Sequence, residues 1–140
     1  MPSSILSALV LDEHPLFRRG IVDTLEASAD ISVCGDTGCL EEFGPLLTRW
    51  SPDVILVSTT FKRNNRYTKI VDTPLRDPPG IIYLSGGGED MDLSTLTLPR
   101  ELGMIRRDIR CDDLCDAVRA IMRSNTARQS DGPFYFHVLT

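Results

Sequence analysis

The sequence has no excess of basic residues and no long apolar run. Lysine and arginine together number 15 against 20 aspartates and glutamates, so the formal net charge is −5. A chain of this charge is a poor partner for nucleic acid through bulk electrostatics. No apolar stretch approaches the roughly 18 residues that a membrane span needs. The apolar run near the N-terminus follows no basic segment and stops at Asp12, so we expect neither a signal peptide nor a membrane partner.

Metal-binding spacing is also missing. The four cysteines, at positions 34, 39, 111 and 115, form no C-x-x-C pair, and no histidine lies near any of them. A zinc site would need closer ligand pairs. We therefore expect no cofactor and no metal at the cysteines, and we interpret them as buried or half-buried thiols of a cytoplasmic protein.

Short apolar runs alternate with segments of helical periodicity over most of the 140 residues. The pattern predicts strands at 5–11, 31–35, 53–57, 81–84 and 103–105, and helices at about 15–28, 40–50, 64–73, 90–101 and 112–123. This alternation predicts one α/β domain with a parallel sheet covered by helices on both faces. Gly44-Pro45 interrupts the second helical pattern, so we expect that helix to be kinked or to start late. Residues 125–140 have the composition of a polar linker with a short apolar tail.

Polar side chains follow four of the five predicted strands. They are Asp12 and Glu13 after the first strand, Ser58 after the third, Ser85 after the fourth, and Arg106 and Arg107 after the fifth. Ligands of open parallel sheets bind at the carboxyl ends of the strands. These carboxylate, hydroxyl and guanidinium groups therefore mark the candidate site.

Two motifs and the spacing of these polar residues carry a resemblance to a known family. The run Leu11-Asp-Glu-His-Pro-Leu-Phe-Arg-Arg-Gly20 and the run Pro52-Asp-Val-Ile-Leu-Val57 are similar to the opening motif and the third strand of receiver domains. The intervals are 45 residues from Glu13 to Ser58, 27 from Ser58 to Ser85 and 22 from Ser85 to Arg107. Residues 5–124 thus resemble the receiver domain of bacterial two-component response regulators of the NarL/LuxR type. The resemblance implies a flavodoxin-like, doubly wound (βα)5 fold with five parallel strands in a domain of residues 1–124.

The resemblance also assigns expected roles to the polar residues. In that family an aspartate at the end of the third strand accepts a phosphoryl group, and Mg²⁺ is held by this aspartate and an acidic pair. Here the acceptor position is Ser58, the acidic pair is Asp12 and Glu13, the hydroxyl position is Ser85, the lysine position is Arg107 and the switch-aromatic position is Met104. A hydroxyl without a neighbouring base is a poor nucleophile, and its presence removes one carboxylate ligand of the metal. We therefore expect a degenerate receiver, without catalytic residues and with at most a weak metal site at Asp12 and Glu13.

Two classes of function remain open. In the first, the domain regulates a DNA-binding transcription factor without aspartyl phosphorylation, and residues 125–140 lead towards a C-terminal helix-turn-helix domain that contacts DNA. In the second, it is a free-standing pseudo-receiver that binds a protein partner or a small molecule. An enzyme is not expected because the sequence shows no nucleophile paired with a base. In the resembled family the last helix contributes to the dimer interface, so we expect a homodimer through its mixed-charge face, formed by Asp116, Arg119 and Arg123.

Overall fold

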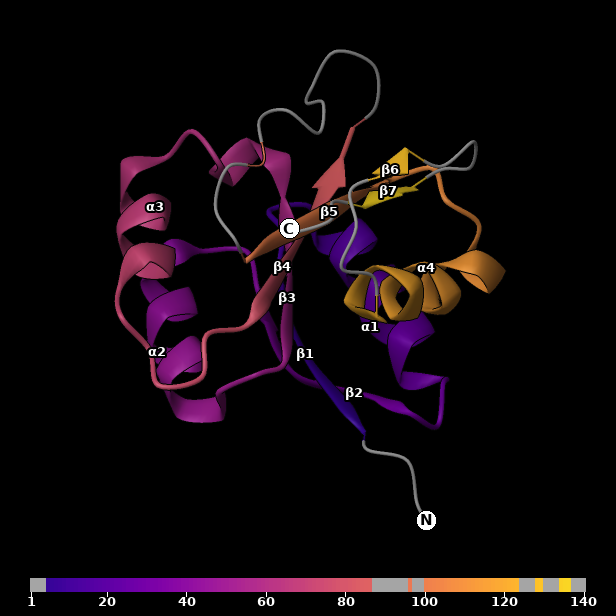
Figure 1. Cartoon of the computed structure of the whole chain (residues 1–140), viewed down its shortest axis with the longest axis horizontal. Helices are drawn as coiled ribbons and strands as arrows, with labels where there is room; N and C mark the ends of the chain where they lie inside the picture. Colours follow the sequence, from indigo (N-terminus) through magenta and orange to yellow (C-terminus); the bar gives the residue numbers. More distant parts are fainter. Residues whose placement is uncertain (1–4, 87–95, 97–99, 124–127, 130–133, 137–140) are drawn as a thin grey trace.

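A parallel sheet runs through the centre of the molecule (Figure 1). The computed structural model describes residues 5–86, 96, 100–123, 128–129 and 134–136. Five parallel strands lie in the order β2-β1-β3-β4-β5; they are β1 (Leu6–Leu11), β2 (Ile31–Thr37), β3 (Val54–Ser58), β4 (Gly80–Ser85) and β5 (Glu101–Arg106). The strand order reverses direction at β1, and this opens a crevice between the carboxyl ends of β1 and β3. The predicted parallel α/β sheet is confirmed.

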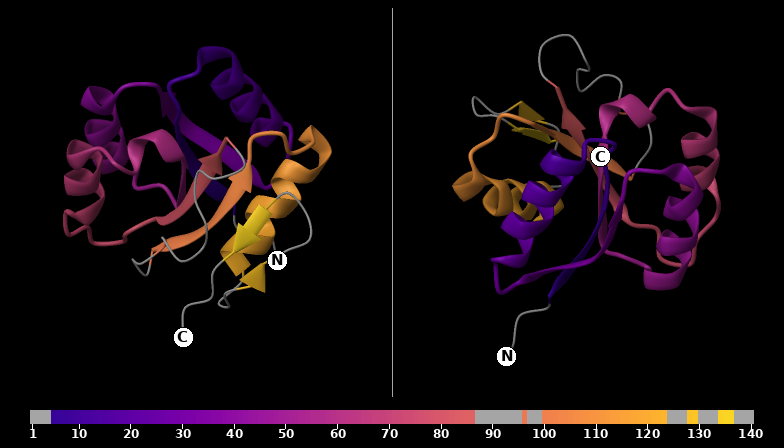
Figure 2. Two further views of the ribbon diagram at one scale, coloured as in Figure 1. Left: turned by 90° about the horizontal axis from the view of Figure 1, so that it is seen from above. Right: turned by 180° about the vertical axis from the view of Figure 1, so that it is seen from behind.

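In the described part of the chain, four α-helices cover the two faces of the sheet. They are α1 (Pro15–Glu26), α2 (Leu40–Trp50), α3 (Asn65–Asp72) and α4 (Cys111–Arg123). The helices α1 and α4 pack together on one face, and α2 and α3 pack together on the other (Figure 2). A single 3-10 turn, η1 (Thr59–Phe61), follows β3. This arrangement confirms the doubly wound, flavodoxin-like fold. None of the described helices combines the length and the apolar character of a membrane span.

The central strands are buried on both faces. In β1, Ala8 and Val10 face the core beneath α1 and α4, whereas Leu9 and Leu11 face the core beneath α2 and α3. The residues from 54 to 57 in β3 alternate between the same two cores, and none of them is exposed. Strands covered on both sides need apolar residues at every position. For that reason β1 and β3 are continuous apolar runs in the sequence.

Two expectations about the helices differ from the structure. The helix α2 begins at Leu40 and contains Pro45 in its second turn, so a late start is wrong and the alternative, a kink, stays a prediction. Proline removes one backbone hydrogen bond there, but Leu40, Phe43 and Leu47 are buried and hold both sides of the interruption against the sheet. The helix predicted at 90–101 lies largely outside the described residues, and its last residue, Glu101, begins β5.

The cysteines do not all lie where the sequence analysis put them. All four are free thiols. Cys34 and Cys115 are half-buried as expected, but Cys39 and Cys111 are exposed. The expectation is therefore wrong for these two residues, which lie at helix starts: Cys39 is the N-cap residue of α2 and Cys111 is the first residue of α4.

Part of the C-terminal segment extends the sheet. The strand β7 (Phe134–Phe136) pairs antiparallel with β5, so that Tyr135 lies opposite Met104. The strand β6 (Arg128–Gln129) pairs antiparallel with β7. The segment expected as a linker thus supplies backbone partners to β5, which would otherwise be an open edge. The expected domain boundary near residue 124 stays a prediction.

An ion pair joins α4 to the turn that precedes β2. The guanidinium of Arg119 donates two hydrogen bonds of 2.8 Å to the carboxylate of Asp30 and one of 2.6 Å to Ser28 Oγ. It also donates a hydrogen bond of 2.8 Å to Asp116. Two of the residues expected at a dimer surface, Asp116 and Arg119, therefore also contribute to contacts within the domain, whereas Arg123 is exposed. The dimer surface itself stays a prediction.

We expect Asp30→Asn to flatten the dependence of stability on pH in acid. Hydrogen bonds from Arg119 and Ser28 hold the pKa of Asp30 well below its usual value of 3.8. A depressed pKa contributes stability that is present above the unfolded-state value and is lost as the pH falls through the folded-state value. Between about pH 6 and about pH 3, the wild type should therefore lose more stability than Asp30→Asn in urea unfolding. Asp108→Asn is the control, because its carboxylate is 65% exposed and pairs with Arg106 on the surface. Parallel pH profiles for wild type and Asp30→Asn would contradict the prediction.

Candidate functional site

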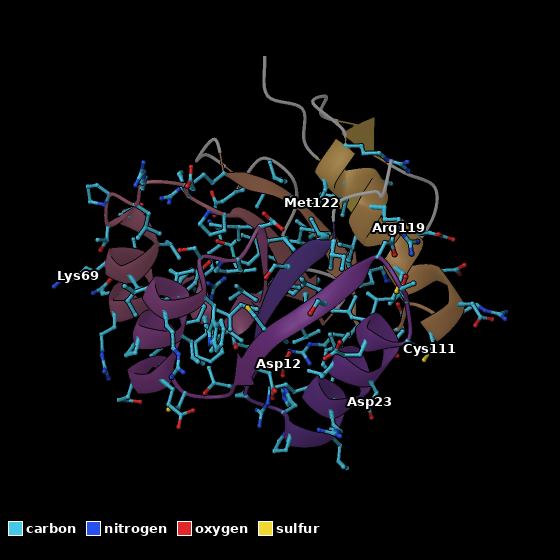
Figure 3. All side chains as sticks on the ribbon, turned by 90° about the horizontal axis from the view of Figure 1, so that it is seen from below. Asp12, Asp23, Lys69, Cys111, Arg119 and Met122 are labelled. Carbon is cyan, nitrogen blue, oxygen red and sulfur yellow. The ribbon has the colours of Figure 1, made fainter. Side chains whose placement is uncertain are left out.

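The candidate site lies where the strand order reverses, at the carboxyl ends of β1 and β3. Asp12 and Glu13 follow β1, Ser58 is the last residue of β3, and Arg107 follows β5. Backbone hydrogen bonds fix these positions: Asp12 N donates to Thr37 O at 3.0 Å, and Arg107 N donates to Ser85 O at 2.8 Å. Figure 3 shows Asp12 beside the start of α1. The parallel register thus brings distant parts of the chain to one edge of the sheet.

Arg107 is at the centre of this site. Its Nη2 donates hydrogen bonds of 2.6 Å to Asp12 Oδ2 and 2.8 Å to Ser58 Oγ. It also lies 3.7 Å from Glu13 Oε1. Asp12 and Ser58 are completely buried, and the Arg107 side chain is only 19% exposed. The guanidinium therefore bridges the ends of β1 and β3 and neutralises a buried carboxylate.

The first residues of α1 complete the surroundings of Asp12 and Arg107. Phe17 places its ring under the guanidinium, with Arg107 Cζ 4.4 Å from the ring centroid. His14 donates its backbone N–H to Asp12 Oδ1 at 2.8 Å, and its Nδ1 lies 3.0 Å from the same oxygen. Arg18 Nη1 donates to the main-chain oxygen of Asp12 at 2.7 Å. Both carboxylate oxygens of Asp12 are thus engaged by the protein.

Glu13 is held by the residues that follow β3. The Thr60 hydroxyl donates a hydrogen bond to Glu13 Oε2 and lies 3.0 Å from Ser58 Oγ. Burial alone would raise the pKa of Glu13. Hydrogen bonds from Thr60, the main chain and Ser58, together with the nearby His14, outweigh it and hold the pKa below its usual range. Glu13 is therefore ionised at neutral pH.

A metal ion fits this arrangement poorly. Ligand atoms of Asp12, Glu13 and His14 lie within 4.8 Å of one another, and among the described residues this is the one such cluster of three or more candidate ligands. Mg²⁺ prefers an octahedral set of oxygen ligands and binds proteins through carboxylates. Here Arg107 and His14 occupy the oxygens of Asp12, and Ser58 supplies a neutral hydroxyl.

Ser85 and Met104 are both buried. Ser85 ends β4, and its carbonyl oxygen accepts the hydrogen bond from Arg107. Met104 lies in the core beneath α2 and α3, in the same cluster as Tyr83. The resemblance places Met104 where the family carries a switch aromatic. In this structure an aromatic ring of the same core comes instead from Tyr83 on the neighbouring strand.

A polar network in the core beneath α2 and α3 was not predicted from the sequence. Tyr83 donates a hydrogen bond of 2.6 Å to Glu101 Oε2, and Lys62 Nζ lies 2.5 Å from the same oxygen. The hydroxyls of Tyr67 and Tyr83 are 3.0 Å apart. Glu101 is only 1% exposed, so Lys62 provides the charge that allows a carboxylate there. The sequence shows Lys62 four residues after Ser58, but nothing in its pattern connects this lysine with Glu101.

A pocket of about 710 Å³ opens beside Arg107. Its wall is formed by residues of the loops after β1, β3, β4 and β5 and by the start of α1: Glu13, His14, Pro15, Leu16, Phe17, Thr59, Thr60, Gly86 and Arg107. The volume lies within the range of about 300–1,000 Å³ that small-molecule sites occupy. Leu16 is 91% exposed at its rim. Charged and apolar groups thus share one concave surface.

Comparisons with known proteins agree with this fold. The chain is 27% identical over 128 residues to the transcriptional regulatory protein LiaR of Bacillus subtilis, covering 90% of this chain and 60% of the relative. It is 25% identical over 118 residues to the DNA-binding transcriptional activator DevR/DosR of Mycobacterium tuberculosis, covering 84% of this chain and 54% of the relative. The chain therefore spans little more than half the length of these relatives. No family model matches the sequence.

A solved structure gives the class of the fold. The receiver domain of the stress response regulator RcsB from Escherichia coli, in its non-phosphorylated form, superposes with a TM-score of 0.70 and 18% identity, covering 86% of this chain and 95% of that domain. The fold is that of a receiver domain. The two curated relatives are both named as transcription regulators.

We expect Arg107→Ala to destabilise the domain strongly. The substitution leaves Asp12 buried without its counter-ion, which costs about 2–4 kcal/mol of unfolding free energy for a partner that is itself slightly exposed. Arg110→Ala is the matched control, because the side chains of Arg110 and its partner Asp112 are 79% and 86% exposed. This control should change the stability by no more than about 0.5 kcal/mol. Urea unfolding at neutral pH measures both. Equal effects of the two substitutions would show that the pair of Arg107 with Asp12 does not hold the site together.

Proposed function

We propose that this chain is the receiver domain of a LuxR-type, DNA-binding transcription regulator and that it works without aspartyl phosphorylation. The observation that carries the proposal is the bridge from Arg107 to the buried Asp12 and Ser58. A neutral hydroxyl stands where the resembled family has an acceptor carboxylate, and a guanidinium stands where it has a lysine. The names of the two relatives support a role in transcription. DNA would be contacted by a C-terminal domain outside these 140 residues.

The geometry at Ser58 supports the absence of phosphotransfer. A serine needs a neighbouring base to become a nucleophile, whereas Ser58 Oγ accepts a hydrogen bond from a guanidinium and lies beside the Thr60 hydroxyl. The positive charge of Arg107 is already neutralised by Asp12 at 2.6 Å. The attraction between Arg107 and the oxygens of an incoming phosphoryl group is therefore weakened. Under this proposal the ion pair holds the ends of β1, β3 and β5 in one arrangement.

A second candidate function is a pseudo-receiver that binds a small molecule or a protein. The pocket beside Arg107 favours it, because an exposed Leu16, the Phe17 ring and the ionised Glu13 line one concavity of about 710 Å³. The reading frame of the gene after Thr140 distinguishes the two functions. A helix-turn-helix segment encoded after Thr140 supports the transcription regulator, and a stop codon directly after it supports the free-standing domain.

The proposal includes a homodimer formed through α4. Asp116 and Arg123 are exposed on this helix, while Arg119 is half-buried and bonded to Asp30. Charge reversal at Arg119 would therefore disturb the fold as well as an interface. A substitution of Arg123 would therefore affect the proposed dimer interface without removing the internal ion pair of Arg119 with Asp30.

We expect no phosphoryl transfer from acetyl phosphate to the wild type. Incubation with Mg²⁺ and the donor should leave the intact mass unchanged, because Ser58 has no base and no acceptor charge. The double variant Ser58→Asp/Arg107→Lys should gain one phosphoryl group, since it restores the carboxylate and the flexible ammonium of the resembled family. Ser58→Asp alone should gain less, because Arg107 would pair with the new carboxylate. A stoichiometric phosphoryl group on Ser58 of the wild type would overturn the proposal.

We also expect Mg²⁺ to bind the wild type only weakly. Calorimetric titration should show no saturation below about 1 mM, because the carboxylate oxygens of Asp12 are already bonded and only two carboxylates are present. The Ser58→Asp/Arg107→Lys variant should bind at least tenfold more tightly, because it adds a third carboxylate and frees Asp12 from the guanidinium fork. Saturation of the wild type at submillimolar Mg²⁺ would show a working metal site and contradict the proposed role of Arg107.

A further inference from the structure

A second pocket, of about 440 Å³, lies between α1 and α4. Its wall is formed by Asp23, Thr24, Ala27, Ser28, Cys111, Asp112 and Cys115, and it shares no residue with the pocket beside Arg107. Figure 3 shows Cys111 at the start of α4, next to the helix that carries Asp23. Two of the four cysteines thus contribute to one concave surface that the proposed function does not use.

The spacing of the two thiols suits a shared ligand. Cys111 and Cys115 are four residues apart on α4, so they lie one above the other on the same face, with Cβ atoms about 5–6 Å apart. Zinc–sulfur bonds measure about 2.3 Å, and two bonds of about this length in a linear sulfur–metal–sulfur unit span about 4.6 Å. Cys111 is exposed and can turn towards its neighbour. Cys115 points its Sγ towards the carbonyl oxygen of Thr24, at 3.6 Å, at the side of the pocket formed by α1.

The carboxylates of the pocket are less suited to be primary ligands. Asp23 pairs with Arg19 at 3.3 Å, and Asp112 lies 3.7 Å from Arg110. Both carboxylates are more than half exposed, so water and these arginines compete for them. Their negative charge nevertheless favours a cation over an anion near the thiols. The two cysteine sulfurs are therefore the expected ligands. Thiolates prefer soft ions such as Cu(I), and such an ion can be coordinated by two sulfurs alone.

We propose, contrary to the expectation from the sequence, that Cys111 and Cys115 form a dithiolate site for a soft, monovalent d10 metal ion of the Cu(I) type. Binding replaces the two S–H protons with two metal–sulfur bonds and releases both protons, with no change of oxidation state. The bound ion would link the first two turns of α4.

The chain provides its own control pair. Cys34 lies in β2 with its Sγ 3.3 Å from the carbonyl oxygen of Ala8, and Cys39 is the N-cap residue of α2. They lie on different elements, whereas Cys111 and Cys115 share one helix face. A double variant Cys34→Ser/Cys39→Ser keeps the same number of thiols as Cys111→Ser/Cys115→Ser, so the two variants separate a specific site from general thiol chemistry.

The test is competition for Cu(I) between the reduced protein and a chromogenic Cu(I) chelator under anaerobic conditions. We expect one equivalent of Cu(I) per chain in the wild type and in Cys34→Ser/Cys39→Ser. Cys111→Ser, which changes an exposed residue, and Cys111→Ser/Cys115→Ser should each weaken binding at least tenfold. The Tm should rise with Cu(I) only in the proteins that bind it, because a ligand of the native state stabilises that state. Wild-type affinity in Cys111→Ser, loss of binding in Cys34→Ser/Cys39→Ser, or no withdrawal of Cu(I) from the chelator would each overturn the proposal.

Discussion

A carboxylate without exposure to water must have a counter-charge, and Asp12 obtains it from Arg107. Asp12 directly follows β1, Ser58 is the last residue of β3, and Arg107 directly follows β5, so one guanidinium fixes three strand ends relative to each other. The other contacts of the site depend on this bridge. Phe17 stacks under the guanidinium of Arg107. The Ser58 hydroxyl, which is bonded to the same guanidinium, lies beside the Thr60 hydroxyl, and Thr60 in turn donates a hydrogen bond to Glu13. Removing one partner of such a buried pair costs far more than removing an exposed pair.

The cores on the two faces of the sheet differ in polarity. Beneath α1 and α4 the cluster of buried hydrophobic residues is aliphatic throughout. Beneath α2 and α3 it includes the hydroxyls of Tyr67 and Tyr83, and next to them lie the carboxylate of Glu101 and the ammonium of Lys62. Burial, together with the adjacent Tyr67 and Glu101, raises the pKa of Tyr83, so the phenol stays a hydrogen-bond donor at every physiological pH. A satisfied polar network of this kind specifies one arrangement of η1, α3 and the start of β5.

Much of the fold was predictable because burial on both faces of a parallel sheet makes a strand apolar at every position, as Leu9 and Val10 illustrate. The residues at the strand ends were predictable for a related reason, since parallel strands bring Asp12, Ser58 and Arg107 to one edge. Contacts between side chains that are far apart in the sequence were not predictable. The pairing of Arg119 with Asp30 joins positions 89 residues apart, and the sequence shows only a charged helix face. The two- and three-residue strands β6 and β7 are too short to show any periodicity. The stacking of Phe17 on Arg107 also has no signal of its own in the sequence.

The bridge also has a consequence for how such a site could change over generations. Restoring an acceptor carboxylate at position 58 alone would place it against Arg107, which could then pair with it as well as with Asp12. Placing a lysine at position 107 alone would loosen the hold on the buried Asp12 and would leave a serine at position 58. Under the proposed function, each single step toward a phosphorylatable receiver would therefore yield less than both together, and the first would be hindered by the residue that the second replaces. A lineage carrying both Ser58 and Arg107 is in this sense entrenched: selection can refine the contacts around the ion pair more easily than it can reverse them.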